Sequence, residues 1–148
     1  VEYDVNEKFN FFNPKVGFTY NLTAGTDAYA SYAIANREPV RSDFIDAPAD
    51  QQPTHETLRN LEIGVRKQSS NWSYQANYFL MNYKDQLVLT GQLNDVGAAV
   101  RINVPKSYRM GVELVSAYQF SDLITWSANV SLSQNRIQEF TEVVYDYG

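Results

Sequence analysis

The chain has 148 residues, a length typical of one domain, and is 44% hydrophobic and 14% aromatic, with 17 acidic against 12 basic side chains. This composition excludes a disordered protein, and the net charge of −5 excludes a nucleic-acid binder with a general basic surface. With no cysteine and only His55 as histidine, it offers no disulfide or thiolate, and no apolar run is long enough for a transmembrane helix.

Alternation of apolar and polar side chains predicts the first strand over residues 14–23. Val16 and Phe18 share one parity, while Gly17 and Thr19 share the other. A period of two is that of a strand with two unlike faces. The same period recurs over the ranges 28–36, 61–66, 72–80, 108–120 and 124–133. We therefore expect six strands and no helix.

Two sizes of connection alternate along the chain. Short segments rich in turn-forming residues lie at 24–27, 69–71 and 121–122. Long connections occupy roughly 37–57, 86–107 and the tail after Gln134. Residues 37–57 are expected to form an irregular loop. Residues 86–90 can extend the preceding strand into the second long connection. Short turns and long loops are thus expected at opposite ends of the sheet.

Aromatic side chains gather near both ends of the predicted strands. Near the short turns these are Tyr20, Tyr29, Trp72, Tyr74, Tyr118, Phe120 and Trp126. Near the long loops they are Phe9, Phe11, Phe12, Tyr83 and Tyr108. Two aromatic belts with smaller aliphatic residues between them are typical of the wall of an outer-membrane β-barrel. The residues expected to face lipid are Val16, Phe18, Ile63, Val112, Leu114 and Val130.

The main alternative is a soluble β-sandwich, which would be a ligand- or glycan-binding module that uses Trp and Tyr in its long loops. Its strands also alternate, but with the apolar faces inward. The predicted strands are longer than typical sandwich strands. Solubility separates the two hypotheses, because an outward apolar band and open sheet edges favour aggregation in water.

Several segments resemble the barrel of TonB-dependent outer-membrane receptors. They are residues 12–18, 29–33, 37–44, 56–58, 61–66, 77–87 and 107–114, and the resemblance extends from about Phe12 to Arg136. It implies an all-β, antiparallel up-and-down meander of about six long strands within a larger transmembrane barrel. Barrels of this family have 22 strands and enclose a plug. Over residues 1–148 we expect a partial barrel domain without plug, signal peptide or C-terminal strand.

The resemblance also implies a function. Receptors of this kind take up a ferric siderophore or a similar nutrient, energised by the TonB system, and perform no catalysis. We expect no metal site and no cofactor, the ferric chelate being cargo. The implied partners are outer-membrane lipid, the rest of the barrel with its plug, and TonB through an N-terminal part that this sequence lacks. The implied location is the bacterial outer membrane.

Charged residues supply the candidate site. Four of them share the polar parity and are expected to face the lumen, where they dock the plug or are simply solvated: Glu62, Arg66, Arg109 and Glu113. The resemblance places three more where a strand leaves the membrane toward a loop, so they are expected to face the ligand or plug: Arg37, Arg41 and Asp43. Arginine suits anionic ferric chelates. Gly17, Gly64 and Gly111 share the polar parity, where they allow close approach of backbone or a bend.

Enzymatic and metal-binding hypotheses are weaker. His55 beside Glu56 resembles a general base with its orienting carboxylate, but adjacent residues on a strand point apart. The loop acids that a glycosidase would require are Asp43, Asp46, Asp50 and Asp95. The stretch 46–50 lacks the dense acidic spacing of a calcium loop.

Overall fold

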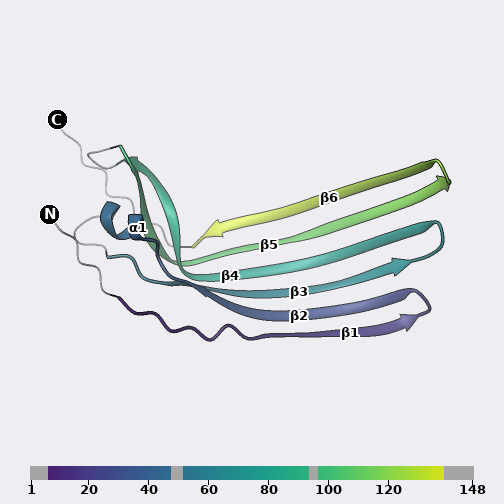
Figure 1. Ribbon diagram of the computed structural model, residues 1–148, viewed down its shortest axis with the longest axis horizontal. Coiled ribbons are helices and arrows are strands. Elements are labelled where there is room, and N and C mark those ends of the chain that lie inside the picture. The colour runs from purple at the N-terminus through teal and green to yellow at the C-terminus, as the bar shows by residue number, and fades with distance from the viewer. Residues whose placement is uncertain (1–6, 48–51, 94–96, 139–148) are drawn as a thin grey trace.

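Six antiparallel strands form one sheet in the order β1-β2-β3-β4-β5-β6, with one short helix at the end where the long connections lie (Figure 1). The structure is a computed structural model that describes residues 7–47, 52–93 and 97–138. The elements are β1 (Lys15–Thr23), β2 (Thr26–Arg37), α1 (Arg41–Asp46), β3 (Glu56–Gln68), β4 (Trp72–Leu93), β5 (Ala99–Ser121) and β6 (Ile124–Ile137). The predicted all-β meander of six strands is confirmed.

The register places side chains of one kind on each face of the sheet. One row across the six strands contains Phe18, Ala30, Ile63, Tyr78, Val112 and Leu132. The next row contains Gly17, Ser31, Glu62, Phe79, Gly111 and Ser133. Because successive side chains point to opposite faces, these rows define an apolar face and a polar face of the sheet.

The apolar face is not covered by any described part of the chain. Phe18 is 72% exposed, Trp126 52%, Ile63 49% and Leu114 48%. All six described strands belong to a single sheet. A sandwich would bring these four side chains together in a dry centre, so the described residues contradict that alternative.

Aromatic residues at the short-turn end form a belt on the apolar face, except Tyr29 of the predicted set, which lies on the polar face opposite Gly64. Trp72, Tyr118 and Trp126 occupy one register row, and the Trp72 Nε1–H donates to Ser116 Oγ at 3.1 Å. An indole with an apolar body and a donor group suits a membrane interface. The belt predicted at the long-loop end is wrong in part, because Tyr83 lies on the polar face and only Tyr108 of that predicted set lies on the apolar face of the sheet.

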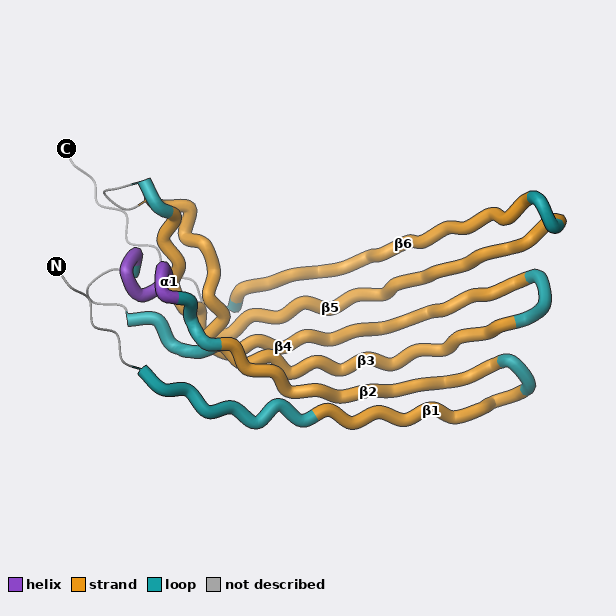
Figure 2. Tube along the Cα trace, in the orientation of Figure 1, coloured by secondary structure: helices purple, strands orange, loops and turns teal. Residues whose placement is uncertain are grey.

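Strands β4 and β5 continue well beyond their neighbours, which corrects the predicted loop over 86–107. Both strands bend sharply near the ends of β2, β3 and β6 (Figure 2). At the bend, Asp85 has φ 54°, and the ladder is interrupted between the pairs Lys84–Lys106 and Gln86–Val104. Pro105 lies opposite Asp85 and has no N–H to donate to the ladder. The free Asp85 carbonyl accepts from Asn103 Nδ2 at 2.6 Å instead.

Most of the small hydrophobic core lies at this end, since Phe79 is the only buried apolar side chain of the described residues that lies in the main part of the sheet. Helix α1 packs against β5, and the absence of any helix was a wrong prediction. Four buried apolar side chains belong to the helix and the bent hairpin: Phe44, Leu87, Val100 and Val104. With six residues α1 is short, and no helix in the described ranges has the length and apolarity needed to cross a membrane.

Candidate functional site

The charged residues predicted on the polar face lie there, but they do not pair with one another. Arg66 on β3 makes an ion pair with Asp27 on β2 at 3.2 Å. Glu62 accepts a hydrogen bond from Asn60 Nδ2 at 2.8 Å. These contacts orient the two side chains along and between strands, with Arg66 itself exposed to solvent.

Arg109 and Glu113 lie further along the same face on β5. The Arg109 guanidinium carbon is 5.6 Å from the centre of the Phe79 ring, within cation–π distance. Glu113 is exposed and has no hydrogen bond or ion pair to any residue that the structure describes. Within the described residues, the Arg109 guanidinium and the Glu113 carboxylate therefore lie on the polar face without an ion pair, and Glu62 has an amide but no cation as its partner.

Two aromatic rings lie on the polar face directly opposite glycines. Tyr29 pairs with Gly64 and Phe79 pairs with Gly111 in the register. A Cβ at Gly64 would collide with the Tyr29 ring, and one at Gly111 would lie 2.8 Å from Phe79 Cζ. The same Cβ atoms would also meet the backbone carbonyl oxygens of Ala76, at 2.6 Å, and Leu132. Gly64 and Gly111 therefore allow the predicted close approach of backbone, and they also make room for a neighbouring ring. Gly17 has only ordinary contacts at 3.5 Å.

Tyr29 also organises a hydrogen-bond network that sequence reasoning missed. Its hydroxyl donates to Asn77 Oδ1 at 3.1 Å and accepts from Gln75 Nε2 at 2.9 Å. Asn77 is buried. The available signal was an aromatic residue on the polar parity of its strand. Which glycine and which amide it meets depends on the strand register.

The polar face is hollowed beside this network. A depression of about 490 Å³ is lined by residues that include Tyr29, Ser31, Glu62, Arg66, Gln75, Asn77 and Glu113. Nearby, the buried Asn60 Oδ1 has no hydrogen-bond partner among the described residues. Hydrogen-bond donors and acceptors, together with acidic and basic side chains, line this surface. Such a lining suits contact with another polar surface.

Two of the three residues predicted to face ligand at the long-loop end are held in structural contacts. Arg37 forms a 2.8 Å ion pair with Glu56, whose other carboxylate oxygen accepts from the Leu87 backbone N–H at 3.1 Å. Asp43 is buried and forms a 3.0 Å ion pair with Arg101 on β5. These two pairs fasten the α1 segment and β3 to the bent hairpin.

Arg41 is the third, and it is exposed on α1 with no ion pair to any described residue. Of the three, it is free to meet a ligand without first breaking a protein contact. Its role toward a ligand or plug remains a prediction, as do those of Arg37 and Asp43.

The alternative sites lack the geometry they need. The His55 ring contacts Phe9 and Phe11, with ring centres 6.2 and 5.4 Å apart. Glu56 is instead engaged by Arg37. Within residues 7–47, 52–93 and 97–138, no three His, Asp or Glu side chains are placed to hold a metal ion. Asp50 and Asp95 lie outside the described residues.

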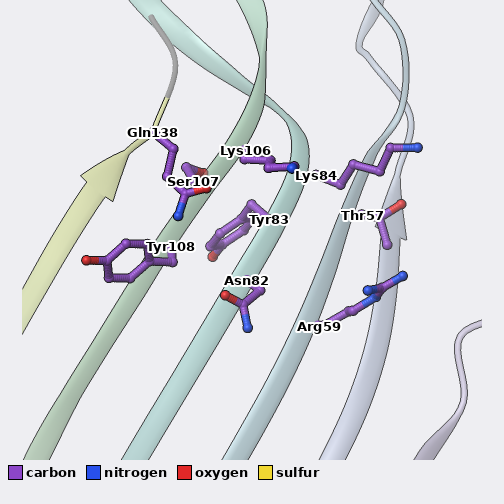
Figure 3. Close-up of a pocket in the computed structure, with 9 residues that line it drawn as sticks. All are labelled: Thr57, Arg59, Asn82, Tyr83, Lys84, Lys106, Ser107, Tyr108 and Gln138. Carbon is purple, nitrogen blue, oxygen red and sulfur yellow. The ribbon is translucent and has the colours of Figure 1, made fainter.

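A second hollow lies on the apolar face, at its long-loop end. This cavity of about 240 Å³ is lined by residues of β3, β4 and β5 and by Gln138, which follows β6 (Figure 3). Three of them are basic: Arg59, Lys84 and Lys106. Sequence reasoning did not single them out, because the three residues come together only through the pairing of three strands.

Solved structures of transport proteins share this sheet. "Copper transporter OprC" aligns with a TM-score of 0.72 and 17% identity, over 84% of this chain and 20% of that one. The siderophore receptor PirA from Pseudomonas aeruginosa gives 0.70 and 19%, over 83% and 25%. The FrpB iron transporter from Neisseria meningitidis (F5-1 variant) gives 0.66 and 25%, over 84% and 20%.

This chain therefore spans about a fifth to a quarter of the length of those proteins. No curated protein sequence matches it significantly. Residues 1–147 match the family described as "TonB dependent receptor-like, beta-barrel". The match covers nearly the whole chain and agrees with the meander and its two unlike faces. The chain belongs to the TonB-dependent receptor-like β-barrel family.

Proposed function

We propose that these six strands form part of the wall of a TonB-dependent outer-membrane receptor that takes up a ferric siderophore or a similar nutrient. Receptors of this family are outer-membrane β-barrels. The observation that carries the proposal is the uncovered apolar face, which runs across all six strands. Facing acyl chains, it would leave the polar face toward a lumen filled with water or a plug.

The height of the apolar band supports this orientation. From Tyr108 to Tyr118, strand β5 advances about 34 Å at about 3.4 Å per residue. A tilt of about 40–45° leaves about 25 Å along the membrane normal, the height of the apolar band of outer-membrane barrels. The aromatic belt of Trp72, Tyr118 and Trp126 would then lie at the periplasmic interface, where short turns are usual.

The cargo is proposed from chemistry and from the structural neighbours together. Those neighbours are named as a copper transporter, a siderophore receptor and an iron transporter. Ferric siderophores are often anionic, and Arg41 at the loop end offers an unpaired guanidinium among the described residues. Binding and gating need no covalent step, so no residue is assigned a catalytic role.

Uptake of iron-55 chelates tests the proposal. Cells that express the receptor carrying this chain are compared with cells lacking it and with cells lacking TonB. Haem, cobalamin and a copper chelate are tested in parallel. We expect accumulation of at least one ferric chelate only when both receptor and TonB are present. Uptake that is independent of TonB, or a receptor that is absent from the outer membrane, would contradict the proposed function.

A further inference from the structure

The apolar face ends, toward the long loops, in two rows that are basic and polar. The first contains Ile34, Arg59, Asn82, Tyr108 and Arg136. The second contains Asn36, Thr57, Lys84 and Lys106. No described residue in either row is acidic. At the short-turn end of the same face the residues are instead largely aromatic. One boundary of the apolar band is therefore basic and the other is aromatic.

Lys84 and Lys106 are direct cross-strand partners on β4 and β5. Like charges placed directly opposite each other destabilise a sheet. One carboxylate lies near the pair, because Lys84 Nζ is 3.7 Å from Asp85 Oδ2. That contact is long and the Lys84 side chain is 74% exposed, so Asp85 holds the Lys84 ammonium only weakly. Both ammonium groups therefore remain available to an anion placed between them.

The surrounding residues add further basic and hydrogen-bonding side chains to the cavity. Lys106 and Lys84 extend the same way across the neighbouring strand, and Arg59 lies on β3 beyond them (Figure 3). Asn82 and Gln138 add amide N–H donors to the lining. The volume of about 240 Å³ is larger than a phosphate group needs. Cationic and neutral donors without an acid match a phosphate ester.

We propose that Arg59, Lys84 and Lys106 bind a phosphate group of a lipid headgroup in the outer leaflet. The inference rests on the proposed membrane orientation, which places this cavity at the upper edge of the acyl-chain region. The apolar face below it continues without interruption through Leu61, Leu80 and Met110. A ligand with both phosphate and acyl chains would therefore contact the cavity and the band together, which free phosphate cannot do.

Lipid retention measured by native mass spectrometry tests the inference. The folded receptor that carries this chain is inserted into vesicles containing bis-phosphorylated lipid A, or its dephosphorylated form, and then extracted. Lys84→Gln/Lys106→Gln is compared with Lys15→Gln/Lys67→Gln, which removes the same charge elsewhere on the sheet. We expect the first variant to retain phosphorylated lipid at least tenfold less than wild type, and the second to stay within twofold. Wild type should prefer the phosphorylated lipid.

Three results would overturn the inference. The first is equal retention by the first variant and wild type, and the second is equal retention of both lipid forms by wild type. The third is complete displacement of the lipid by millimolar inorganic phosphate, which would assign the cavity to the free ion. Failure of the receptor to insert into vesicles would overturn the proposed function as well, whereas insertion without lipid preference would overturn only this inference.

Discussion

At the scale of single residues, the polar face depends on glycines that accommodate aromatic rings. Tyr29 and Phe79 break the alternation of their strands, yet each lies across from a residue without a side chain. The ring covers backbone that would otherwise be open, and in the case of Tyr29 it also brings a hydroxyl to Asn77 and Gln75. Each of these two aromatic rings on the polar face therefore packs against the glycine opposite it, and the break in alternation has a structural reason.

Gly64→Ala should destabilise the barrel by about 1–3 kcal/mol, the usual cost of overpacking. Its Cβ would meet both the Tyr29 ring and the Ala76 carbonyl oxygen at 2.6 Å, so the ring cannot relieve the clash alone. Urea unfolding of the intact receptor, followed by heat-modifiable gel mobility, measures the loss. Gly17→Ala is the matched control, because its nearest atoms are 3.5 Å away. Equal stability of the two variants would contradict the packing argument.

Arg41 and Arg37 differ in what their removal should do. Arg41→Ala should weaken chelate binding about tenfold or more, because one charge-assisted contact contributes about 1.5 kcal/mol or more, while leaving folding unchanged. The measurement is the concentration dependence of iron-55 uptake at matched surface expression. Arg37→Ala breaks the ion pair with Glu56 and serves as the structural comparison. Unchanged uptake affinity in Arg41→Ala would remove its ligand role.

At the scale of elements, the β4–β5 hairpin is the unusual component. It bends at Asp85 and Pro105 because one residue has a left-handed backbone and the other lacks a ladder donor. Beyond the bend, α1 and residues 52–55 lie against it, with Asn103 bonded to both the N–H and the carbonyl of Thr54 at 2.8 and 3.0 Å. The loop end is thus a small packed unit rather than separate loops.

Arg101→Leu should loosen this unit without unfolding the sheet. It removes the ion partner of Asp43, which is only 6% exposed, and a buried hydrogen bond to a charged group contributes about 1.5–3 kcal/mol. We expect faster amide hydrogen exchange in α1 and in residues 99–104. Arg41→Leu, on the exposed side of the same helix, should leave exchange unchanged. Exchange that stays slow in Arg101→Leu, or that rises equally throughout β1–β6, would contradict this expectation.

At the scale of the whole molecule, the faces of the sheet follow opposite rules. The apolar face requires an apolar environment, and the polar face requires a wet or polar one. The open edges at β1 and β6 carry unpaired backbone groups, which a closed barrel would pair. The described strands therefore make physical sense as part of a larger closed sheet.

Arginine scanning distinguishes the two faces. Val112→Arg and Val130→Arg should lower assembly of the receptor, because arginine at the lipid midplane costs about 2–4 kcal/mol. Ser131→Arg should be tolerated, since it lies on the polar face opposite Glu113. The fraction of heat-modifiable barrel in outer membranes gives the comparison. Equal losses in all three variants would show that the face assignment is wrong.

The parity of each strand was predictable because side-chain direction alternates with a period that the backbone imposes. Val16, Phe18, Ile63, Val112, Leu114 and Val130 therefore share one face, as expected. The short turns were predictable from their Gly, Ser, Asn and Asp residues. The helix was missed because a six-residue segment has too few turns to show a period.

The sequence by itself thus determined the strands, their two faces and the end at which the long connections gather, since all of these follow from local geometry. The tertiary structure alone decided which residues meet across strands: Tyr29 over Gly64, Asp43 with Arg101, and Lys84 beside Lys106. Such contacts depend on register and on a bend that swings a hairpin back over α1. Alternation within one strand does not say which residue of the next strand lies opposite a given residue. The pairing of residues between strands is therefore decided only by the tertiary structure.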